Sequence, residues 1–304
     1  MDVSKKAYGR YEKWIQTRVH RADGITALIT GGNSGLGYAC AQWLLALGAR
    51  VLLACRSPER GQSAVQRLRA EFPRSEILLL AVDLADLASV DALAEEVAKR
   101  VEKIDLLMHF AGVYYPKESQ TAQGRPMTVG VNYEGTVRLT EALLPCMDAS
   151  GRVVFTTSLV DRFGRAKAPR KEGYAAYAQS KLLLSAYAHQ KACKRGEKEP
   201  AFIAAHPGIT ATSLLDPTKT THSPVFSRLG HAFLYVFTHS KEKAALTAVL
   251  AALGDCQNGD CIGPRGIFGI SGYPHKTSYC RNVKRYARQG LATPPVTPCE
   301  EGEQ

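Results

Sequence analysis

Near its start the chain reads Thr30-Gly31-Gly32-Asn33-Ser34-Gly35-Leu36-Gly37, a glycine-rich stretch between an apolar run at 25–30 and an amphipathic run at 36–47. The apolar run predicts a buried strand and the amphipathic run predicts a helix. Glycines let the backbone turn tightly, and the first turn of a helix offers free N–H groups and a partial positive charge to a phosphate. The stretch therefore predicts a strand, a pyrophosphate-binding loop and a helix, in preference to glycines that only form a turn.

The same alternation of short apolar runs and longer amphipathic stretches continues along the chain. Buried strands are expected at residues 25–30, 51–55, 77–82, 104–110, 152–157 and 201–206. Helices are expected at residues 36–47, 58–71, 86–101, 127–147, 174–194 and 241–253. Six strands joined by helices predict an α/β fold with a doubly wound parallel sheet, the three-layer α/β/α Rossmann arrangement, and a ligand site at the carboxyl ends of the strands.

The length of 304 residues suits a single domain, which we place at residues 24–280. Residues 1–23 form a basic extension expected to be helical, and residues 281–304 are expected to form a mobile tail. Residues 213–240 break the regular pattern and are expected to form a lid over an apolar substrate, although core packing is the likelier explanation for any single aromatic residue there. The aromatic and apolar residues in that segment are Phe226, Phe233, Leu234, Tyr235 and Phe237.

The formal net charge of +11 is concentrated near the two ends of the chain. No aromatic-interleaved RNA-binding motif lies between them, so nucleic-acid binding is disfavoured. Tyr11, Trp14, Ile15 and Val19 recur at helical spacing, which fits a peripheral contact with an anionic membrane and fits packing against the domain or a partner equally well.

The chain carries no long apolar run and no export signal at its start, so we expect a cytoplasmic protein with reduced thiols. Its cysteines do not form the paired Cys-x-x-Cys motifs of a zinc site, and no metal is expected. The eight cysteines are Cys40, Cys55, Cys146, Cys193, Cys256, Cys261, Cys280 and Cys299.

Arg56 follows the second predicted strand, in the sequence Cys55-Arg56-Ser57. Enzymes that use NAD usually place an acidic residue there to bind the adenosine ribose, and a carboxylate would repel a 2′-phosphate. An arginine instead attracts that phosphate through a charge-assisted contact. Arg56 therefore predicts that NADP(H) is preferred over NAD(H), with a solvated surface arginine as the alternative.

Tyr177 and Lys181 lie four residues apart in a predicted helix and so share one helical face. An ammonium beside a phenol favours the phenolate, which is expected to lower the pKa of Tyr177 and make it a general acid/base. Tyr174 lacks a lysine at this offset, whereas Tyr187 has Lys191 four residues later.

Two polar residues accompany this pair. Ser158 ends the fifth predicted strand, where its hydroxyl can bind a substrate carbonyl or can simply cap a turn. Asn132 lies inside a predicted helix, where asparagine is a poor helix former. It is expected to hold a water that links Lys181 to solvent, or else to bend the helix through a side-chain bond to the backbone.

Taken together, the residues resemble the short-chain dehydrogenase/reductase family, and within it the retinol dehydrogenase-like group. The resemblance covers residues 24–212. It implies a catalytic tetrad of Asn132, Ser158, Tyr177 and Lys181 in an oxidoreductase that interconverts a carbonyl and an alcohol on a small or apolar substrate. Related enzymes are often dimers or tetramers, which the resemblance extends to this chain.

The resemblance also implies which residues bind the cofactor. Lys181 would bind the nicotinamide ribose, Pro207-Gly208-Ile209 would line the nicotinamide and Thr212 would hold its carboxamide or the phosphates. Asp83 and Leu84 would lie beside the adenine, although Asp83 could also cap the following helix. The full predicted cofactor set is Gly31, Asn33, Ser34, Gly35, Leu36, Gly37, Arg56, Asp83, Leu84, Ala111, Gly112, Tyr177, Lys181, Pro207, Gly208, Ile209 and Thr212.

The sequence departs from the family pattern at two places. The family usually has Asn-Asn-Ala-Gly after the fourth strand, where this chain has His109-Phe110-Ala111-Gly112, so the local packing must differ. The loop between Ser158 and Tyr177 is long, which leaves Thr157 as a second candidate for the serine position. A non-catalytic NADP(H)-sensing protein that binds a protein partner is the alternative function, and the intact tetrad argues against it.

Overall fold

The computed structural model describes residues 3–165, 173–208, 240–266 and 269–290, with the side chains described from residue 9 onward. Its centre is an eight-stranded sheet in the order β3-β2-β1-β4-β5-β6-β7-β8. The neighbours from β3 to β7 pair in parallel, and β8 pairs antiparallel with β7. The strands are β1 Thr26–Thr30, β2 Arg50–Cys55, β3 Ile77–Ala81, β4 Leu106–His109, β5 Arg152–Thr156, β6 Ala201–Ala205, β7 Cys261–Pro264 and β8 Pro274–Thr277.

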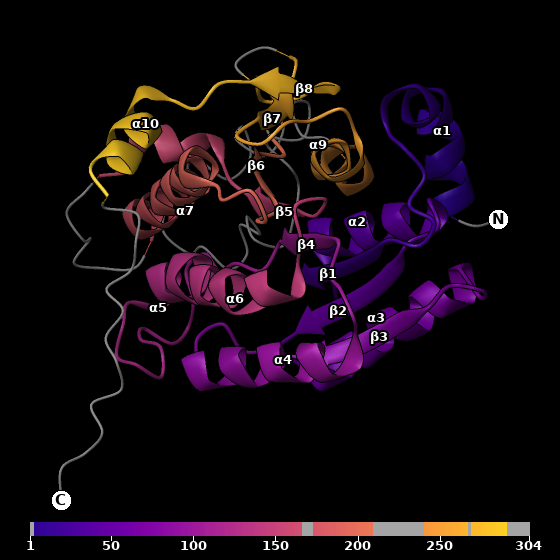
Figure 1. The fold of residues 1–304 in the computed structure, drawn as a ribbon, viewed down its shortest axis with the longest axis horizontal. Coiled ribbons are helices and arrows are strands. Elements are labelled where there is room, and N and C mark those ends of the chain that lie inside the picture. Colours follow the sequence, from indigo (N-terminus) through magenta and orange to yellow (C-terminus); the bar gives the residue numbers. More distant parts are fainter. Residues whose placement is uncertain (1–2, 166–172, 209–239, 267–268, 291–304) are drawn as a thin grey trace, which may run out of the picture.

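Helices cover both faces of the sheet and bury two separate apolar clusters (Figure 1). Helices α4, α6 and α7 share one cluster with the sheet, and α1, α2, α3 and α9 share the other. This arrangement confirms the predicted three-layer α/β/α Rossmann fold. The helices are α1 Val3–Arg18, α2 Gly35–Ala46, α3 Pro58–Glu71, α4 Leu87–Arg100, α5 Met127–Val129, η1 Gly130–Gly135, α6 Thr136–Leu143, η2 Leu144–Cys146, η3 Leu159–Phe163, α7 Tyr174–Lys194, α9 Lys241–Leu253 and α10 Arg281–Arg288.

The sheet has two more strands than the six that the sequence predicts. Both β7 and β8 are only four residues long and carry a proline at one end, and β8 exposes His275, Lys276 and Thr277. Neither segment has the run of β-branched residues that marks a strand, so their pairing depends on the neighbouring sheet edge.

The predicted helix at residues 127–147 is not one continuous α-helix. It passes from α5 into the π-helix η1, then into α6 and finally into the 3₁₀ turn η2. The Thr136 hydroxyl donates to the Val131 carbonyl at 3.2 Å, a side-chain bond that spans five residues within the wide turn. Pro145, which has no N–H to donate, lies in η2. The prediction of a single regular helix is therefore wrong.

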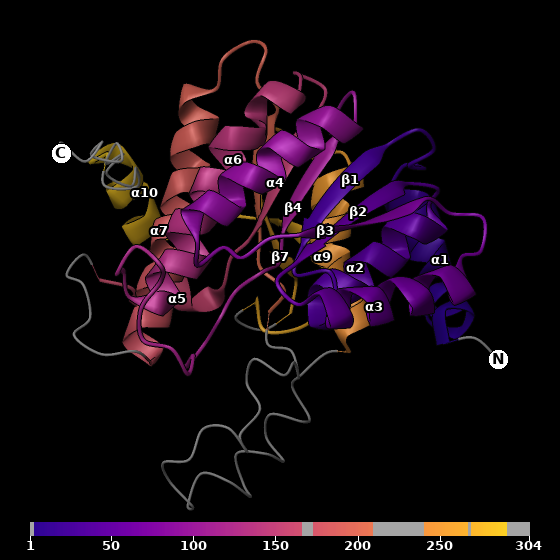
Figure 2. The ribbon, with the colours of Figure 1, turned by 90° about the horizontal axis from the view of Figure 1, so that it is seen from below.

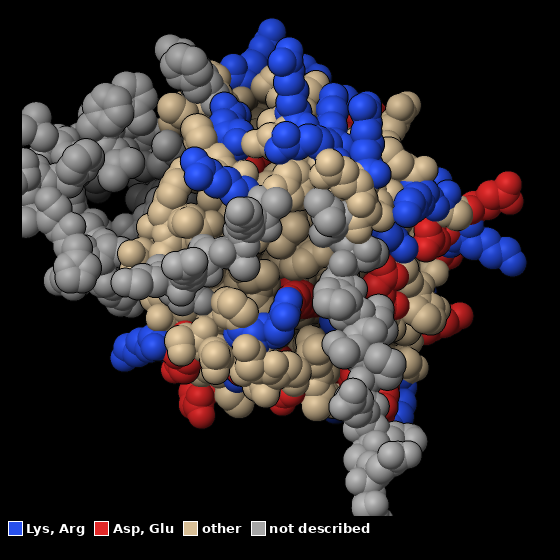
Figure 3. Space-filling model, turned by 90° about the vertical axis from the view of Figure 1, so that its left-hand side faces the viewer, with Lys and Arg blue, Asp and Glu red and all other residues tan. Residues whose placement is uncertain are grey.

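The predicted mobile tail from residue 281 begins instead with a packed helix, α10. Val283, Tyr286 and Ala287 are buried, and α10 packs against α7 and η3. The helix exposes its basic side chains, and basic residues gather on this face of the molecule (Figure 3). The segment is predicted to be mobile because of its many basic residues, although its few apolar residues form a narrow stripe that packs on the domain. Residues 291–304 of the predicted tail, and all the predicted lid except Ser240, lie outside the described residues.

The basic N-terminal extension is a helix packed on its own domain. Tyr11 and Ile15 are buried, and the Tyr11 ring meets the Trp43 ring edge-on with the centroids 6.2 Å apart. Helices α1 and α10 lie at opposite ends of the molecule in both views (Figures 1 and 2). Among the described helices, none has the length and apolar character needed to cross a bilayer.

Candidate active site

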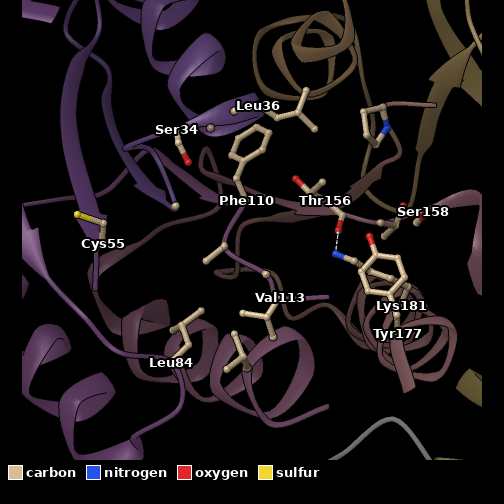
Figure 4. A pocket seen from close by; sticks show the side chains of 18 of the residues that line it. Ser34, Leu36, Cys55, Leu84, Phe110, Val113, Thr156, Ser158, Tyr177 and Lys181 are labelled. Atoms are coloured by element: carbon tan, nitrogen blue, oxygen red, sulfur yellow. Dashed lines mark hydrogen bonds between the residues drawn. The ribbon is translucent and has the colours of Figure 1, made fainter. Parts of the chain in front are cut away.

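A cavity of about 1000 Å³ lies at the carboxyl ends of the parallel strands. The glycine loop after β1 lines one part of it, and Ser158, Tyr177 and Lys181 line another (Figure 4). The structure places almost the whole predicted cofactor set on its wall. The lining residues from that set are Gly31, Asn33, Ser34, Gly35, Leu36, Gly37, Arg56, Asp83, Leu84, Ala111, Gly112, Tyr177, Lys181, Pro207 and Gly208.

The glycine loop has the local geometry that a pyrophosphate needs. Gly31 has a φ of 69°, and a Cβ at that position would lie 2.7 Å from the Ala111 nitrogen. Gly35 has a φ of 57° and no atom near the place of a Cβ, so its backbone borders open space. Ser34 precedes α2 without capping it through its side chain, which leaves the first N–H groups of that helix available to an anion. The loop therefore fits a dinucleotide phosphate.

Two arginines line the cavity beyond β2. Arg56 is exposed at the strand end, and Arg60, which the sequence analysis missed, lies four residues later in α3. Ser57 is the N-cap of α3 and accepts a hydrogen bond from the Arg60 backbone nitrogen at 3.3 Å. Arg60 lies in the first turn of α3, only four residues after Arg56, and this closeness in sequence is the signal that could have identified it.

Asp83 also lines the cavity but does not cap the next helix. Its carboxylate accepts from the Ala85 nitrogen at 3.0 Å, whereas Asp86 is the N-cap of α4 and accepts from the Ala88 nitrogen at 3.1 Å. The helix-cap alternative for Asp83 is therefore wrong.

Tyr177 and Lys181 project from α7 toward the carboxyl end of β5. Burial raises the pKa of Tyr177 to about 12, and a hydrogen bond with Ser158 opposes that rise. The Lys181 ammonium donates to the Thr156 carbonyl at 2.8 Å and lies 5.8 Å from the centroid of the Tyr177 ring (Figure 4). The expected lowering of the Tyr177 pKa by Lys181 is wrong for the protein alone, because the ammonium points to the strand carbonyl.

Lys181 is a buried cation with an acidic neighbour. Burial lowers the pKa of Lys181 to about 8, and the charge of Asp161 opposes that decrease. Burial also raises the pKa of Asp161 to about 6, although hydrogen bonds, chiefly from the Ser185 hydroxyl at 2.9 Å, favour the charged carboxylate. The pair shows that the site holds ionisable groups where their charged forms are costly.

Ser158 supplies the hydroxyl group that is hydrogen-bonded to the phenol of Tyr177. It is the N-cap of η3, accepts from the Val160 nitrogen at 3.5 Å and is hydrogen-bonded to Tyr177. Thr157 is buried beside it and also lines the cavity. The geometry favours Ser158 over Thr157 as the partner of Tyr177.

Asn132 lies behind the cavity wall, in the π-helix η1. Its carboxamide oxygen accepts from the Val113 nitrogen at 2.7 Å, and its amide donates to the Val113 carbonyl at 2.9 Å and to the Ser180 hydroxyl at 3.1 Å. The side-chain bond to the backbone therefore reaches the loop after β4 and not the helix that contains Asn132. This side chain fixes that loop against the residue that precedes Lys181.

His109 occupies the position where the family usually has asparagine. It is buried, stacks on Phe155 with the ring centroids 5.3 Å apart, and has its Nε2 2.9 Å from the Thr140 hydroxyl. Because that hydroxyl donates to the Thr136 carbonyl at 2.8 Å, Nε2 carries the proton and donates to it. Burial lowers the pKa of His109 to about 3, so the ring is neutral and ties β4 to α6.

Other cavity residues carried no recognised sequence signal. Arg162 and Phe163 lie in the 3₁₀ helix η3 and Ile270 lies in a loop, none of them within a motif, and only the packing of η3 and of the segment after β7 brings them to the site. Two predicted residues, Ile209 and Thr212, lie outside the described residues.

The sequence of this chain is similar to those of a known protein family and of several of its members. The model of the short chain dehydrogenase family matches residues 25–223, well over half of the chain. The human dehydrogenase/reductase SDR family member 13 is 37% identical over 201 residues, which are 63% of this chain and 53% of that protein. Mouse retinol dehydrogenase 11 is 32% identical over 238 residues, which are 76% of this chain and 73% of that protein.

Solved protein structures are also similar to this chain in fold. An uncharacterized protein from Mycobacterium paratuberculosis superposes with a TM-score of 0.70 at 26% identity, covering 90% of this chain and 92% of the other. Levodione reductase superposes with a TM-score of 0.62 at 27% identity, covering 76% and 90%. The chain spans about half of the length of the human and bovine SDR family member 13 proteins. The chain therefore belongs to the short-chain dehydrogenase family.

Proposed function

We propose that this protein is an NADP(H)-dependent oxidoreductase that interconverts a carbonyl and an alcohol on a small or apolar substrate. The observation that carries the proposal is one cavity lined by the glycine loop and Arg56, and also by Ser158, Tyr177 and Lys181. Family membership supports oxidoreduction at CH–OH groups. The names of the relatives, a retinol dehydrogenase and a levodione reductase, describe alcohol oxidation and carbonyl reduction respectively.

The preference for NADP(H) is supported by charge at the adenosine end of the cavity. Arg56 and Arg60 both line it, and neither forms a salt bridge within the described parts of the chain. The pKa of the neighbouring Glu59 is lowered chiefly by a backbone hydrogen bond and in part by the charge of Arg60. An arginine guanidinium binds a phosphate through charge-assisted hydrogen bonds. A 2′-phosphate would therefore meet two available cations there.

The proposed chemistry assigns the proton to Tyr177 and the orientation of the substrate to Ser158. A bound nicotinamide dinucleotide supplies or accepts the hydride. Tyr177 gives a proton to the carbonyl oxygen during reduction and takes it back during oxidation. Ser158 donates to the same oxygen, and Lys181 holds positive charge beside the phenol and the ribose. Asn132 keeps the loop after β4 and the helix of Lys181 in place through its three hydrogen bonds.

A pair of matched tyrosine variants tests this assignment. Tyr177→Phe removes the proton donor and is expected to lower kcat/KM for aldehyde reduction by about 10²- to 10⁴-fold, with little change in NADPH affinity. The measurements are NADPH absorbance over a panel of aldehydes and ketones, and NADPH binding by fluorescence. Tyr187→Phe is the control, because its hydroxyl lies on the same helix but donates to Glu141 at 2.6 Å. A Tyr177→Phe enzyme within tenfold of wild type would remove Tyr177 from the proposed role.

A further inference from the structure

Exposed aromatic side chains gather around one side of the proposed active site. Among the described residues, four large apolar side chains are exposed, and three of them are Tyr115, Phe163 and Tyr174, at 53%, 62% and 51%. The fourth, Tyr273, packs against Trp14 and Tyr11. Large apolar side chains scattered singly need no explanation, but a group beside a catalytic residue does.

A chain of ring contacts connects Tyr115, through Tyr114, to Tyr177. The Tyr114 ring meets the Tyr177 ring edge-to-face with the centroids 5.2 Å apart, and meets the Tyr115 ring in the same way, also at 5.2 Å. Tyr174 lies three residues before Tyr177, close to the same face of α7. Phe163 lines the cavity itself. We call Tyr114, Tyr115, Phe163 and Tyr174 the aromatic rim.

The rim is held in place at some cost to the backbone. Tyr115 has a φ of 51° and is the only non-glycine residue with a positive φ in the described parts of the chain. Its ring lies against Gly173, where a Cβ would come within 2.9 Å of the Tyr115 hydroxyl. The loop that leads to Tyr115 is anchored at Val113 by two hydrogen bonds with Asn132. A strained conformation that keeps an exposed ring beside a site is more typical of ligand contact than of packing.

Burial raises the pKa of Tyr114, and the charges of Tyr115 and Tyr174 raise it further. The Tyr114 phenol therefore stays neutral at physiological pH. The rim offers ring faces and edges without any formal charge of its own. Aromatic rings attract one another in stacked and edge-to-face arrangements beyond what apolar area alone provides.

We propose that the aromatic rim binds an aromatic ring of the substrate, carried by a short aliphatic chain away from the carbonyl that reacts at Tyr177. This inference rests on the proposed function, because it names the class of substrate for the same site. The Tyr114 ring contacts both Tyr177 and Tyr115. The aliphatic chain of the substrate would therefore run past Tyr114, from the carbonyl at Tyr177 to the ring on the rim. A compound with a saturated ring of similar size would keep the apolar area and lose the ring–ring attraction.

The test compares two ligands that cannot be reduced, 4-phenylbutanamide and 4-cyclohexylbutanamide, by calorimetry in the presence of saturating NADPH. The two amides share a chain length and a head group, and one has a planar aromatic ring where the other has a saturated ring of six carbons. The phenyl compound is expected to bind wild type about 3- to 10-fold more tightly. In each of the single variants Tyr115→Leu and Tyr174→Leu, the ratio of phenyl to cyclohexyl affinity is expected to fall to about one. Tyr115→Phe keeps an aromatic ring and should keep the ratio. Tyr273→Leu is the control, because it removes an exposed tyrosine outside the rim.

Equal affinities in wild type, failure of both amides to bind, or a ratio that survives both leucine variants would each overturn the proposal. The corresponding aldehydes, 4-phenylbutanal and 4-cyclohexylbutanal, separate this proposal from the proposed function. Reduction of both aldehydes with equal amide affinities would leave the oxidoreductase and remove the ring site. A retained affinity ratio without any reduction would leave the ring site and remove the oxidoreductase.

Discussion

Arg56 and Arg60 are the basic residues that line the cavity beyond β2, where we propose that the adenosine binds. Replacing Arg56 by Asp puts a negative charge where a 2′-phosphate would bind and restores the acidic residue typical of NAD enzymes. A charged hydrogen bond of this kind is worth about 1.5–3 kcal/mol, so kcat/KM for NADPH is expected to fall by about tenfold or more while that for NADH holds or rises. Steady-state kinetics with both coenzymes measure the change.

Arg74→Asp is the matched control for that substitution. Arg74 is also exposed and makes the same change of charge, but it lies before β3, at the amino end of the strands and away from the cavity. Its coenzyme ratio should match that of wild type. An unaltered ratio in Arg56→Asp, or an equal shift in Arg74→Asp, would show that Arg56 does not contact the coenzyme.

Lys181 illustrates how a residue with a proposed catalytic role can lower stability. Its pKa falls from 10.5 to about 8 on burial, which corresponds to a cost of about 3 kcal/mol below pH 8. The hydrogen bond to the Thr156 carbonyl recovers part of that cost. We therefore expect Lys181→Met to lose activity and to raise the free energy of unfolding at pH 7 by about 1–3 kcal/mol.

The stability difference between Lys181→Met and wild type should also depend on pH. Between pH 8 and pH 10.5 the unfolded chain binds the Lys181 proton more tightly than the folded chain, so wild type gains stability as the pH rises through this window. The advantage of Lys181→Met should accordingly shrink between pH 7 and pH 9.5 in urea unfolding experiments. A variant that is less stable than wild type at pH 7 would mean that the hydrogen bond outweighs the cost of burial.

At the scale of elements, the π-helix η1 fits closely against the loop that carries Leu84. A Cβ on Gly135, the last residue of η1, would clash with the Leu84 carbonyl oxygen. Gly135→Ala is expected to cost about 1–3 kcal/mol, because backbone cannot move aside as a flexible side chain can. It should also weaken NADPH binding, since Leu84 lines the cavity. Chemical denaturation and a binding titration measure the two effects.

Gly9→Ala provides the control for this substitution, because Gly9 lies in helix α1 with no atom near the place of a Cβ. Alanine there should leave stability unchanged or raise it by about 0.5–1 kcal/mol. Equal stability effects of the two substitutions would mean that η1 does not press on the Leu84 loop.

The elements also show what the sequence could and could not predict. Helices α3, α7 and α9 have the predicted boundaries. Serine side chains cap the starts of α3 and α9, whereas apolar periodicity without a capping side chain marks the start of α7. The two short strands at the sheet edge and the π-turn of η1 carry no local signal. Their form depends on partners that are distant in sequence, such as Val113 for Asn132.

Among the residues that line the cavity, some could be predicted from the sequence and others could not. Residues inside a motif, such as Gly31, Arg56 and Tyr177, could be placed on its wall from the sequence. Arg162 and Phe163 could not, because the position of the short helix η3 is decided by what it packs against. The direction of the Lys181 ammonium could not be predicted either, because it depends on a strand carbonyl that spacing along the helix does not reveal.

At the scale of the whole molecule, α10 closes the side of the domain that supports the proposed catalytic residues. It packs on α7, which carries Tyr177 and Lys181, and on η3, which begins just after Ser158. The Asn282 amide donates to the Arg162 carbonyl at 3.0 Å, so α10 is also tied to the loop that lines the cavity. Its exposed basic side chains contribute charge on this face but little of the attachment (Figure 3).

Tyr286 tests whether this attachment matters for the molecule as a whole. Tyr286→Ala removes a large buried side chain from between α10 and the domain and is expected to cost about 3–5 kcal/mol. Lys284→Ala, an exposed position on the same helix, should stay within about 0.5 kcal/mol of wild type. Denaturant unfolding compares the two variants. If α10 unfolds separately, a small early transition will appear in Tyr286→Ala with the main transition unmoved. A single shifted transition shows instead that α10, α7 and η3 unfold as one unit, which is what their shared packing predicts.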